Sequence, residues 1–80
     1  KEEPSMLDKI REIMTRYVEL NPEDIHEDSR LAEDLALTSF AVMSMMGDFE
    51  EEFGITVDEN ELTDIHTVGD IMAYIKSKQA

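Results

Sequence analysis

The spacing of apolar residues in the first quarter of the chain is helical, and this limits what the chain can fold into. Apolar side chains recur there at intervals of three and four residues, at Met6, Ile10, Ile13, Met14, Tyr17 and Val18. Such intervals place side chains on one face of an α-helix. Ser5 can cap its start, and Asn21-Pro22 ends it because the residue before a proline avoids the helical conformation. We therefore predict a first helix that begins near Met6 and ends before Asn21.

A second helix is predicted from about Ser39 to Phe53. Its apolar side chains lie mainly on one face, at Phe40, Met43, Met46, Phe49 and Phe53, with Val42 and Met45 beside it. Gly54 follows at the position where a left-handed residue commonly ends a helix. We take this apolar face as the one that packs against the rest of the domain.

Two further helices are predicted in the last third of the chain. The run Asp58-Glu59-Asn60-Glu61 has the spacing of a capping box and predicts a short third helix through Leu62 and Ile65. The run Thr67-Val68-Gly69-Asp70 predicts the cap of a last helix, which buries Val68, Ile71, Met72 and Ile75. Between the second and third helices, Ile55-Thr56-Val57 is extended but too short to form a sheet.

The predicted fold class is therefore all-α: a small four-helix bundle of three longer helices and a short third helix, with a long first loop. This loop runs from Asn21 to about Thr38, and connections of that length in a compact domain are often functional. We expect its apolar residues to pin it across the bundle, at Ile25, Leu31, Leu35 and Leu37. The length of 80 residues leaves room for a single domain, residues 1–80.

The charge of the chain is strongly negative and unevenly placed. Twenty Asp and Glu stand against seven Lys and Arg, for a formal net charge of −13, and Arg30 is the single basic residue between Tyr17 and Ile75. Nucleic acid and anionic membrane surfaces both require a basic protein, so we expect neither as a partner. There is no cysteine and no apolar run long enough to span a membrane, so we expect no membrane insertion and a cytoplasmic monomer.

Few residues are arranged for chemistry. His26 and His66 lie in separate polar segments, and the acidic stretch Asp58–Asp64 fails as a calcium loop because Leu62 and Thr63 stand where an oxygen ligand and a glycine are needed. We therefore predict no metal site. Ser39 lies where the long loop meets the second helix, and its ordinary role there would be an N-cap. No base or acid is near enough in sequence to activate it, so we predict a protein that is not an enzyme, with any chemistry at Ser39 performed by another protein.

Three segments of the chain resemble the acyl carrier protein family. They are Leu35-Ala36-Leu37-Thr38-Ser39-Phe40, the run from Glu50 to Val57 that contains Glu-Glu-Phe-Gly-Ile, and Thr67-Val68-Gly69-Asp70-Ile71 continuing to Tyr74-Ile75. The resemblance extends from Met6 to Ile75. It implies that a transferase moves 4'-phosphopantetheine from coenzyme A onto the serine at the start of the second helix, and that the thiol of this arm carries an acyl chain as a thioester. Ser39 is the matching residue.

The resemblance also implies a cavity for the acyl chain between the second and third helices. Its candidate lining residues are Met46, Val57, Leu62 and Ile65, although for any one of them an ordinary core role is favoured. An unbranched methionine side chain suits an adaptable cavity.

The segment around Ser39 departs from the pattern of the family. Thr38 replaces the usual aspartate and Phe40 the usual leucine, and acids are missing from the start of the second helix. The residues expected to contact partners are Thr38, Phe40, Val42 and Met45. We therefore expect a specialised carrier with its own partners: a phosphopantetheinyl transferase, and acyl-loading and acyl-processing enzymes with basic or apolar docking patches.

Several functions stay open on the sequence alone. The leading one is a standalone acyl carrier in fatty acid or specialised polyketide or lipid biosynthesis. A carrier of aminoacyl or peptidyl groups has the same arm, but such carriers are often less acidic. An unmodified interaction module that keeps the fold is the third, favoured by Thr38 and opposed by the retained Ser39.

Overall fold

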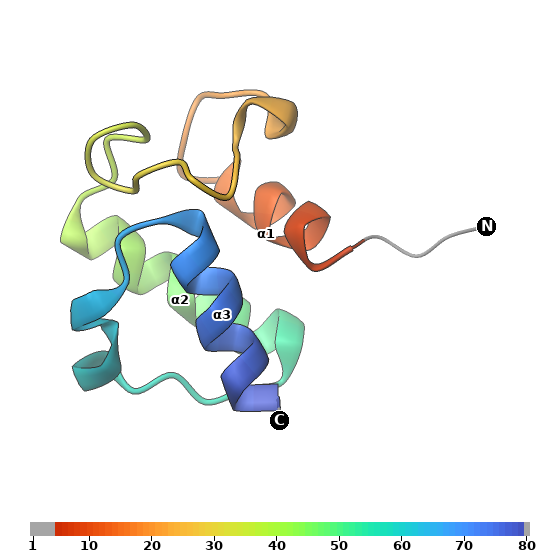
Figure 1. The fold of residues 1–80 in the computed structure, drawn as a ribbon, viewed down its shortest axis with the longest axis vertical. Coiled ribbons are helices and arrows are strands. Elements are labelled where there is room, and N and C mark those ends of the chain that lie inside the picture. Colours follow the sequence, from red (N-terminus) through yellow and green to blue (C-terminus); the bar gives the residue numbers. More distant parts are fainter. Residues whose placement is uncertain (1–4, 80) are drawn as a thin grey trace.

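The computed structural model describes residues 5–79 and consists of helices joined by irregular segments. In chain order these are α1 (Met6–Met14), the 3₁₀ helix η1 (Pro22–Asp24), α2 (Ser39–Phe53), the 3₁₀ helix η2 (Glu59–Asp64) and α3 (Val68–Gln79). The long connection between α1 and α2 crosses the end of the bundle at which α2 and α3 begin (Figure 1). Within residues 5–79 the only β contact is an isolated antiparallel bridge between Arg30 and Thr67. The all-α prediction is confirmed.

One hydrophobic core joins the three α-helices to the long connection. Its fully buried members come from each of the three α-helices, and include Ile10 and Met14 of α1, Met45, Met46 and Phe49 of α2, and Val68, Ile71 and Ile75 of α3. The connection contributes Ile25, Leu31, Leu35 and Leu37, all buried, so the prediction that these residues pin the loop across the bundle is confirmed. Burial of this kind fixes the position of the segment that leads into Ser39.

The first helix is shorter than its apolar spacing predicts. Ser5 caps it as expected, since its hydroxyl accepts from the N–H of Asp8 at 3.1 Å. The helix ends at Met14, however, because the backbone N–H groups of Arg16 and Tyr17 bond three residues back, to the carbonyls of Ile13 and Met14. Val18 is still buried, so the helical stripe continues as turns after the helix ends.

The second helix has the predicted bounds, but only part of its predicted packed face is buried. Thr38 caps its start by accepting from the N–H of Ala41 at 3.1 Å, and Gly54 ends it with a φ of 64°. The side chains of Phe40 and Met43, placed on the packed face from sequence, are instead 82% and 42% exposed. The core is filled by Met45, Met46 and Phe49. Apolar residues surround most of α2, so their spacing could not fix which side faces inward.

The third helix is a 3₁₀ helix without the predicted capping box. Asp58 does cap η2, by accepting from the N–H of Asn60 at 2.9 Å. Its own N–H donates to the hydroxyl of Tyr74 in α3 at 3.1 Å, and Glu61, the expected partner, accepts instead from Tyr74 at 2.7 Å. Lys78 forms an ion pair with the same carboxylate at 2.8 Å. The residues expected to close η2 on itself therefore hold it against α3.

The start of α3 has a complete capping box and is joined to the long connection. The N–H of Asp70 donates to the hydroxyl of Thr67, and the N–H of Thr67 donates to the carboxylate of Asp70, each at 3.1 Å. The N–H of Gly69 donates to the carbonyl of Glu27 at 2.7 Å, and a β-carbon on Gly69 would lie 3.1 Å from that oxygen. The bridge beside Thr67 adds a bond from the N–H of Leu31 to the carbonyl of His66 at 2.8 Å.

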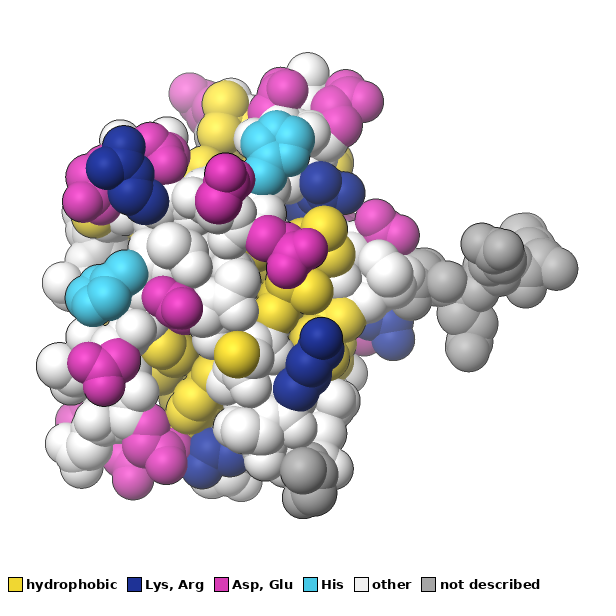
Figure 2. All heavy atoms as spheres, in the orientation of Figure 1, with side chains coloured by type: hydrophobic (Ala, Val, Ile, Leu, Met, Phe, Trp, Pro, Cys, Tyr) yellow, Lys and Arg dark blue, Asp and Glu magenta, His cyan; other side chains and the backbone are white. Residues whose placement is uncertain are grey.

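Acidic side chains are spread over the surface and few are paired. Figure 2 shows Asp and Glu distributed around the visible face, with apolar side chains gathered in a band between α1 and α3. Residues 5–79 contain five ion pairs, from Lys9–Glu52 at 4.0 Å to Lys78–Glu61 at 2.8 Å. Along the same residues no helix has the length and apolar character to cross a bilayer. No group of three or more histidine, aspartate or glutamate side chains in this part of the chain could hold a metal ion.

Candidate functional site

Ser39 is the first residue of α2, and its hydroxyl is not used to cap the helix. The N-cap is Thr38, so the ordinary role considered for Ser39 from sequence is filled by its neighbour. Ser39 is exposed, and its hydroxyl forms no hydrogen bond among those found for residues 5–79. Leu35 and Leu37, which precede Ser39 in the chain, are buried in the core and hold its backbone in place. The result is a free hydroxyl on a fixed backbone.

The electrostatics at this position favour an attached anion, despite the charge of the whole chain. The N-terminus of a helix carries a partial positive charge, and no acidic residue lies in the first turn of α2. Upstream, Asp34 is paired: it accepts from the side chain of Arg30 at 3.2 Å and from the backbone N–H of Arg30 at 2.8 Å. These bonds lower the pKa of Asp34. A phosphodiester on Ser39 would therefore lie at the positive end of α2, and the first turn of the helix has no acidic side chain to repel it.

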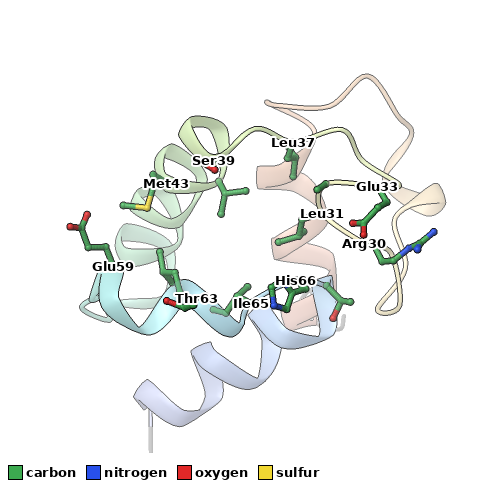
Figure 3. Close-up of a pocket in the computed structure, with 14 residues that line it drawn as sticks. Arg30, Leu31, Glu33, Leu37, Ser39, Met43, Glu59, Thr63, Ile65 and His66 are labelled. Carbon is green, nitrogen blue, oxygen red and sulfur yellow. The ribbon is translucent and has the colours of Figure 1, made fainter.

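A groove of about 510 Å³ begins at Ser39 and runs between α2 and η2. In Figure 3, Ser39 and Met43 form the α2 side, Thr63 and Ile65 form the opposite side, and Leu31 and Leu37 of the long connection close one end. Leu62 and Val42 add further apolar surface. Arg30, Glu33 and His66 give the loop end a polar rim. We call this the first groove.

A second groove, also of about 510 Å³, continues along α2 in the direction of its C-terminus. Its lining residues are Met43, Met46, Gly47, Glu50, Thr56, Val57, Asp58 and Glu59. Met43 and Glu59 line both grooves, so the two meet at these side chains.

The four predicted cavity residues are thus divided between the two grooves. Leu62 and Ile65 line the first, and Met46 and Val57 line the second. Sequence reasoning missed Met43, which it assigned to the core. The available signal was its position four residues after Ser39, which places the two side chains on the same side of a helix.

The predicted partner-contact residues are only partly on the surface. Thr38 and Phe40 are exposed beside Ser39, and Phe40 projects into solvent with no core contact. Val42 is half-buried and lines the first groove. The prediction for Met45 is wrong, because this side chain is 0% exposed. It lies one helical turn before the fully buried Phe49, and so faces the core rather than a partner.

The η2 wall of the groove is held by charged and aromatic side chains from α3. The hydrogen bond and ion pair with Lys78, followed by the hydrogen bond from Tyr74, lower the pKa of Glu61. Burial, and then the bond to Glu61, raise the pKa of Tyr74. The ammonium group of Lys78 also lies 5.5 Å from the centre of the Tyr74 ring. At neutral pH the carboxylate is therefore charged and keeps η2 in position.

A small helical domain with a free serine at a helix start, beside an apolar groove, is suited to carry a covalently attached group. In agreement, a sequence profile described as "Phosphopantetheine attachment site" matches residues 8–75. An acyl carrier protein of Wolinella succinogenes is 33% identical over 75 residues, which cover 94% of this chain and 99% of the relative. An acyl carrier protein of Thermotoga maritima is 36% identical over 70 residues, covering 88% and 86%. A solved structure of the acyl carrier protein from Enterococcus faecalis superimposes with a TM-score of 0.75 at 26% identity, covering 90% of this chain and 91% of that one.

The chain therefore belongs to the acyl carrier protein family, within the larger family of phosphopantetheine attachment domains. Its covalent cofactor is 4'-phosphopantetheine, and the domain is a carrier on which enzymes act rather than an enzyme. Its partners in general are a phosphopantetheinyl transferase and acyl-processing enzymes.

Proposed function

We propose that Ser39 is the residue that receives the 4'-phosphopantetheine arm, and that the chain carries acyl groups as thioesters on it. The observation that supports this most is that the hydroxyl of Ser39 is exposed and unbonded, and that the same residue lines an apolar groove. When attached, the arm supplies a terminal thiol that can form a thioester.

The attachment itself is a phosphoryl-group transfer onto Ser39. The serine oxygen forms a bond to the phosphorus of coenzyme A that bears the pantetheine, and the bond from that phosphorus to the adenosine bisphosphate breaks. The serine proton passes to a base of the transferase, since the carrier offers no base at this position. Thr38 contributes by capping α2, which keeps the backbone of Ser39 in one conformation.

The groove contributes shelter for the cargo. Each methylene group removed from water gains about 0.8 kcal/mol, so a tethered acyl chain gains by lying against Leu62, Ile65 and Val42. The partly exposed side chains of the groove can move to admit it, because none of these three is fully buried.

The surface beside Ser39 favours a dedicated set of partners. Phe40 is 82% exposed, and the first turn of α2 carries no acid. A partner that docks here would need an apolar pocket for Phe40, whereas basic patches would bind acids elsewhere on the surface. We infer a specialised acyl carrier of the cytoplasm, acting as a monomer in polyketide or lipid synthesis rather than as the general carrier of fatty acid synthesis.

Intact mass spectrometry tests the attachment. The chain is incubated with coenzyme A and a broad-specificity phosphopantetheinyl transferase, beside Ser39→Ala and Thr38→Asp variants. We expect the mass of one phosphopantetheine to be added to the wild type and none to Ser39→Ala. Thr38→Asp should keep the melting temperature, because aspartate is an equally good N-cap, and should be modified faster by the generalist enzyme.

The opposite result would separate the alternatives. No added mass on the wild type or on Thr38→Asp, and none on protein from its native host, would overturn the carrier proposal. It would favour an interaction module that keeps the fold without the arm.

A further inference from the structure

A stripe of residues on the outer side of α2 leads away from Ser39. Phe40, Met43 and Gly47 follow one another at intervals of three and four residues, so they lie on the same side of the helix. Phe40 is 82% exposed and Met43 is 42% exposed. We call these three residues the α2 stripe. Any enzyme that reaches the hydroxyl of Ser39 meets the start of this stripe, because Phe40 is the next residue.

The α2 stripe ends in the second groove, where Gly47 leaves an open space. Glycine is a weak helix former, so helix stability does not explain its place inside α2. Gly47 has no left-handed φ, and a β-carbon built on it would meet nothing within 4 Å, so neither the backbone nor the packing requires a glycine. A larger side chain would fill the space. Seven residues separate Phe40 from Gly47, which is about 10 Å along the helix axis.

The lining of the second groove determines what kind of side chain fits there. Beside Gly47 lie the buried Met46 and the half-buried Val57, and the exposed Asp58 and Glu59 border them. None of the ion pairs found in residues 5–79 includes either of these acids, and no basic residue lines the groove. In Figure 3, Glu59 projects outward from the start of η2. A lysine or arginine matches both parts, because its hydrocarbon stem can lie on apolar surface while its charged end meets the acids.

The charge of the chain selects the partner that supplies this side chain. A second copy of the chain is disfavoured, since each copy has a net charge of −13 and the two would repel each other. The first turn of α2 has no acid, so a basic patch placed directly over Ser39 would find no carboxylate there. A basic residue of a partner is therefore matched by the second groove and not by the start of the helix.

We propose that the phosphopantetheinyl transferase that modifies this carrier docks along the α2 stripe through two features of its own surface. One is an apolar pocket that receives Phe40. The other, about 10 Å from the pocket, is a lysine or arginine whose stem lies over Gly47 and whose charged end meets Asp58 and Glu59. The inference rests on the proposed attachment at Ser39 and adds to it the chemistry of the docking partner.

The kinetics of modification test the apolar part of this contact. The carrier is incubated with coenzyme A and the phosphopantetheinyl transferase of its native host, and intact mass gives kcat and KM for the carrier. Gly47→Leu should raise KM about tenfold and leave kcat unchanged, because it removes docking and not chemistry. Phe40→Ala should raise KM by a similar factor, since truncation of a buried aromatic anchor is costly. Gly47→Ala fills little of the space and should raise KM about twofold or less.

Melting temperatures and a second leucine variant separate docking from folding. Leucine is the better helix former, so the unmodified Gly47→Leu protein should melt no lower than wild type. Ala73→Leu, on the exposed surface of α3, is the matched control and should keep the KM of the wild type.

The charged part of the contact is tested by the dependence on salt. Glu59→Gln should raise KM about threefold at low ionic strength, and the difference should vanish near about 0.5 M sodium chloride, where exposed charges are screened. Glu12→Gln makes the same change of net charge at an exposed residue of α1 that lines neither groove. It should leave KM close to that of the wild type at every salt concentration.

Three outcomes would overturn the inference and leave the proposed function standing, since the wild type would still gain one arm. The first is the KM of the wild type in Gly47→Leu or in Phe40→Ala. The second is an equal rise of KM in Gly47→Leu and Ala73→Leu. The third is an equal change of KM in Glu59→Gln and Glu12→Gln. If the wild type gains no mass at Ser39, the proposed function fails, and the inference fails with it.

Discussion

At the scale of single residues, Ala36 is under strain. Its φ is 55°, the only positive value at a non-glycine residue among residues 5–79. The left-handed conformation brings a β-carbon close to the following carbonyl oxygen, which costs about 1–2 kcal/mol. Ala36 lies between the buried Leu35 and Leu37, so the backbone cannot relax without removing one of them from the core.

Ala36→Gly should therefore stabilise the protein. Relief of the strain exceeds the entropy that glycine adds to the unfolded chain, and we expect the free energy of unfolding to rise by about 0.5–1 kcal/mol. Urea denaturation measures this. Ala73→Gly, at an exposed and ordinary helical position, is the control and should lower it by about 1 kcal/mol. Destabilisation by both variants would show that the strain at Ala36 is absent in solution.

At the scale of elements, the cap of α3 depends on an ionised Asp70. Hydrogen bonds from the backbone N–H of His66, opposed by burial, and then from Thr67 lower the pKa of Asp70. A carboxyl whose pKa falls on folding stabilises the native state above its unfolded pKa of about 3.9. That contribution is lost as the pH falls through the lower, folded pKa.

Asp70→Asn isolates this contribution. At neutral pH the variant should melt below the wild type, because an amide oxygen is a weaker acceptor than a carboxylate. The difference should narrow as the pH is lowered from about 5 toward 2, since the wild type then also loses its charge. Melting curves of both proteins across this range measure it. A difference that stays constant with pH would mean that the charge of Asp70 does not support the cap.

The boundaries of an element were predictable where a single residue determines them. They were less predictable where several residues can bond the same group. Thr38 and Gly54 suit the two ends of α2, and that helix has its predicted range. The orientation of α2 was not predictable, because Met43 and Met45 are equally apolar and only the packed structure places one outside and one inside. The predicted capping box of η2 is absent because Tyr74, distant in sequence, bonds both the N–H of Asp58 and the carboxylate of Glu61.

The candidate site shows the same contrast. Ser39 was predicted as the candidate residue from its segment, and the four predicted cavity residues all line one groove or the other. The division of the lining residues between two grooves, which share Met43 and Glu59, depends on how α2 and η2 pack together, and spacing along the chain does not encode this.

At the scale of the whole molecule, the net charge of −13 opposes the compact state. The radius of gyration is 11.8 Å, while the screening length is about 30 Å at 0.01 M salt and about 3 Å at 1 M. At low salt every acid therefore repels every other. The exposed ion pairs offset little of this, since such pairs contribute about 0–1 kcal/mol each.

Salt should accordingly raise the melting temperature, by about 5 °C or more between those two concentrations of sodium chloride. Magnesium chloride should give the same rise at a lower ionic strength, since a divalent ion is drawn more strongly to the acidic surface. Calorimetric scans in both salts, with a constant buffer, measure it. An unchanged midpoint in both would contradict the view that self-repulsion limits stability.

The hydrogen bonds that join the long connection to α3 restrict the length that the connection can have. Loops ordinarily accept inserted or deleted residues. Here Glu27 and Leu31 are tied to the start of α3, while Leu35 and Leu37 are buried a few residues before Ser39. A peptide or label inserted between Leu31 and Ser39 would displace the proposed modification site, whereas one inserted near the exposed Leu20, before these anchors, would leave it in place. The length of the anchored part of the connection thus sets the position of Ser39, and only the part before these anchors tolerates insertions.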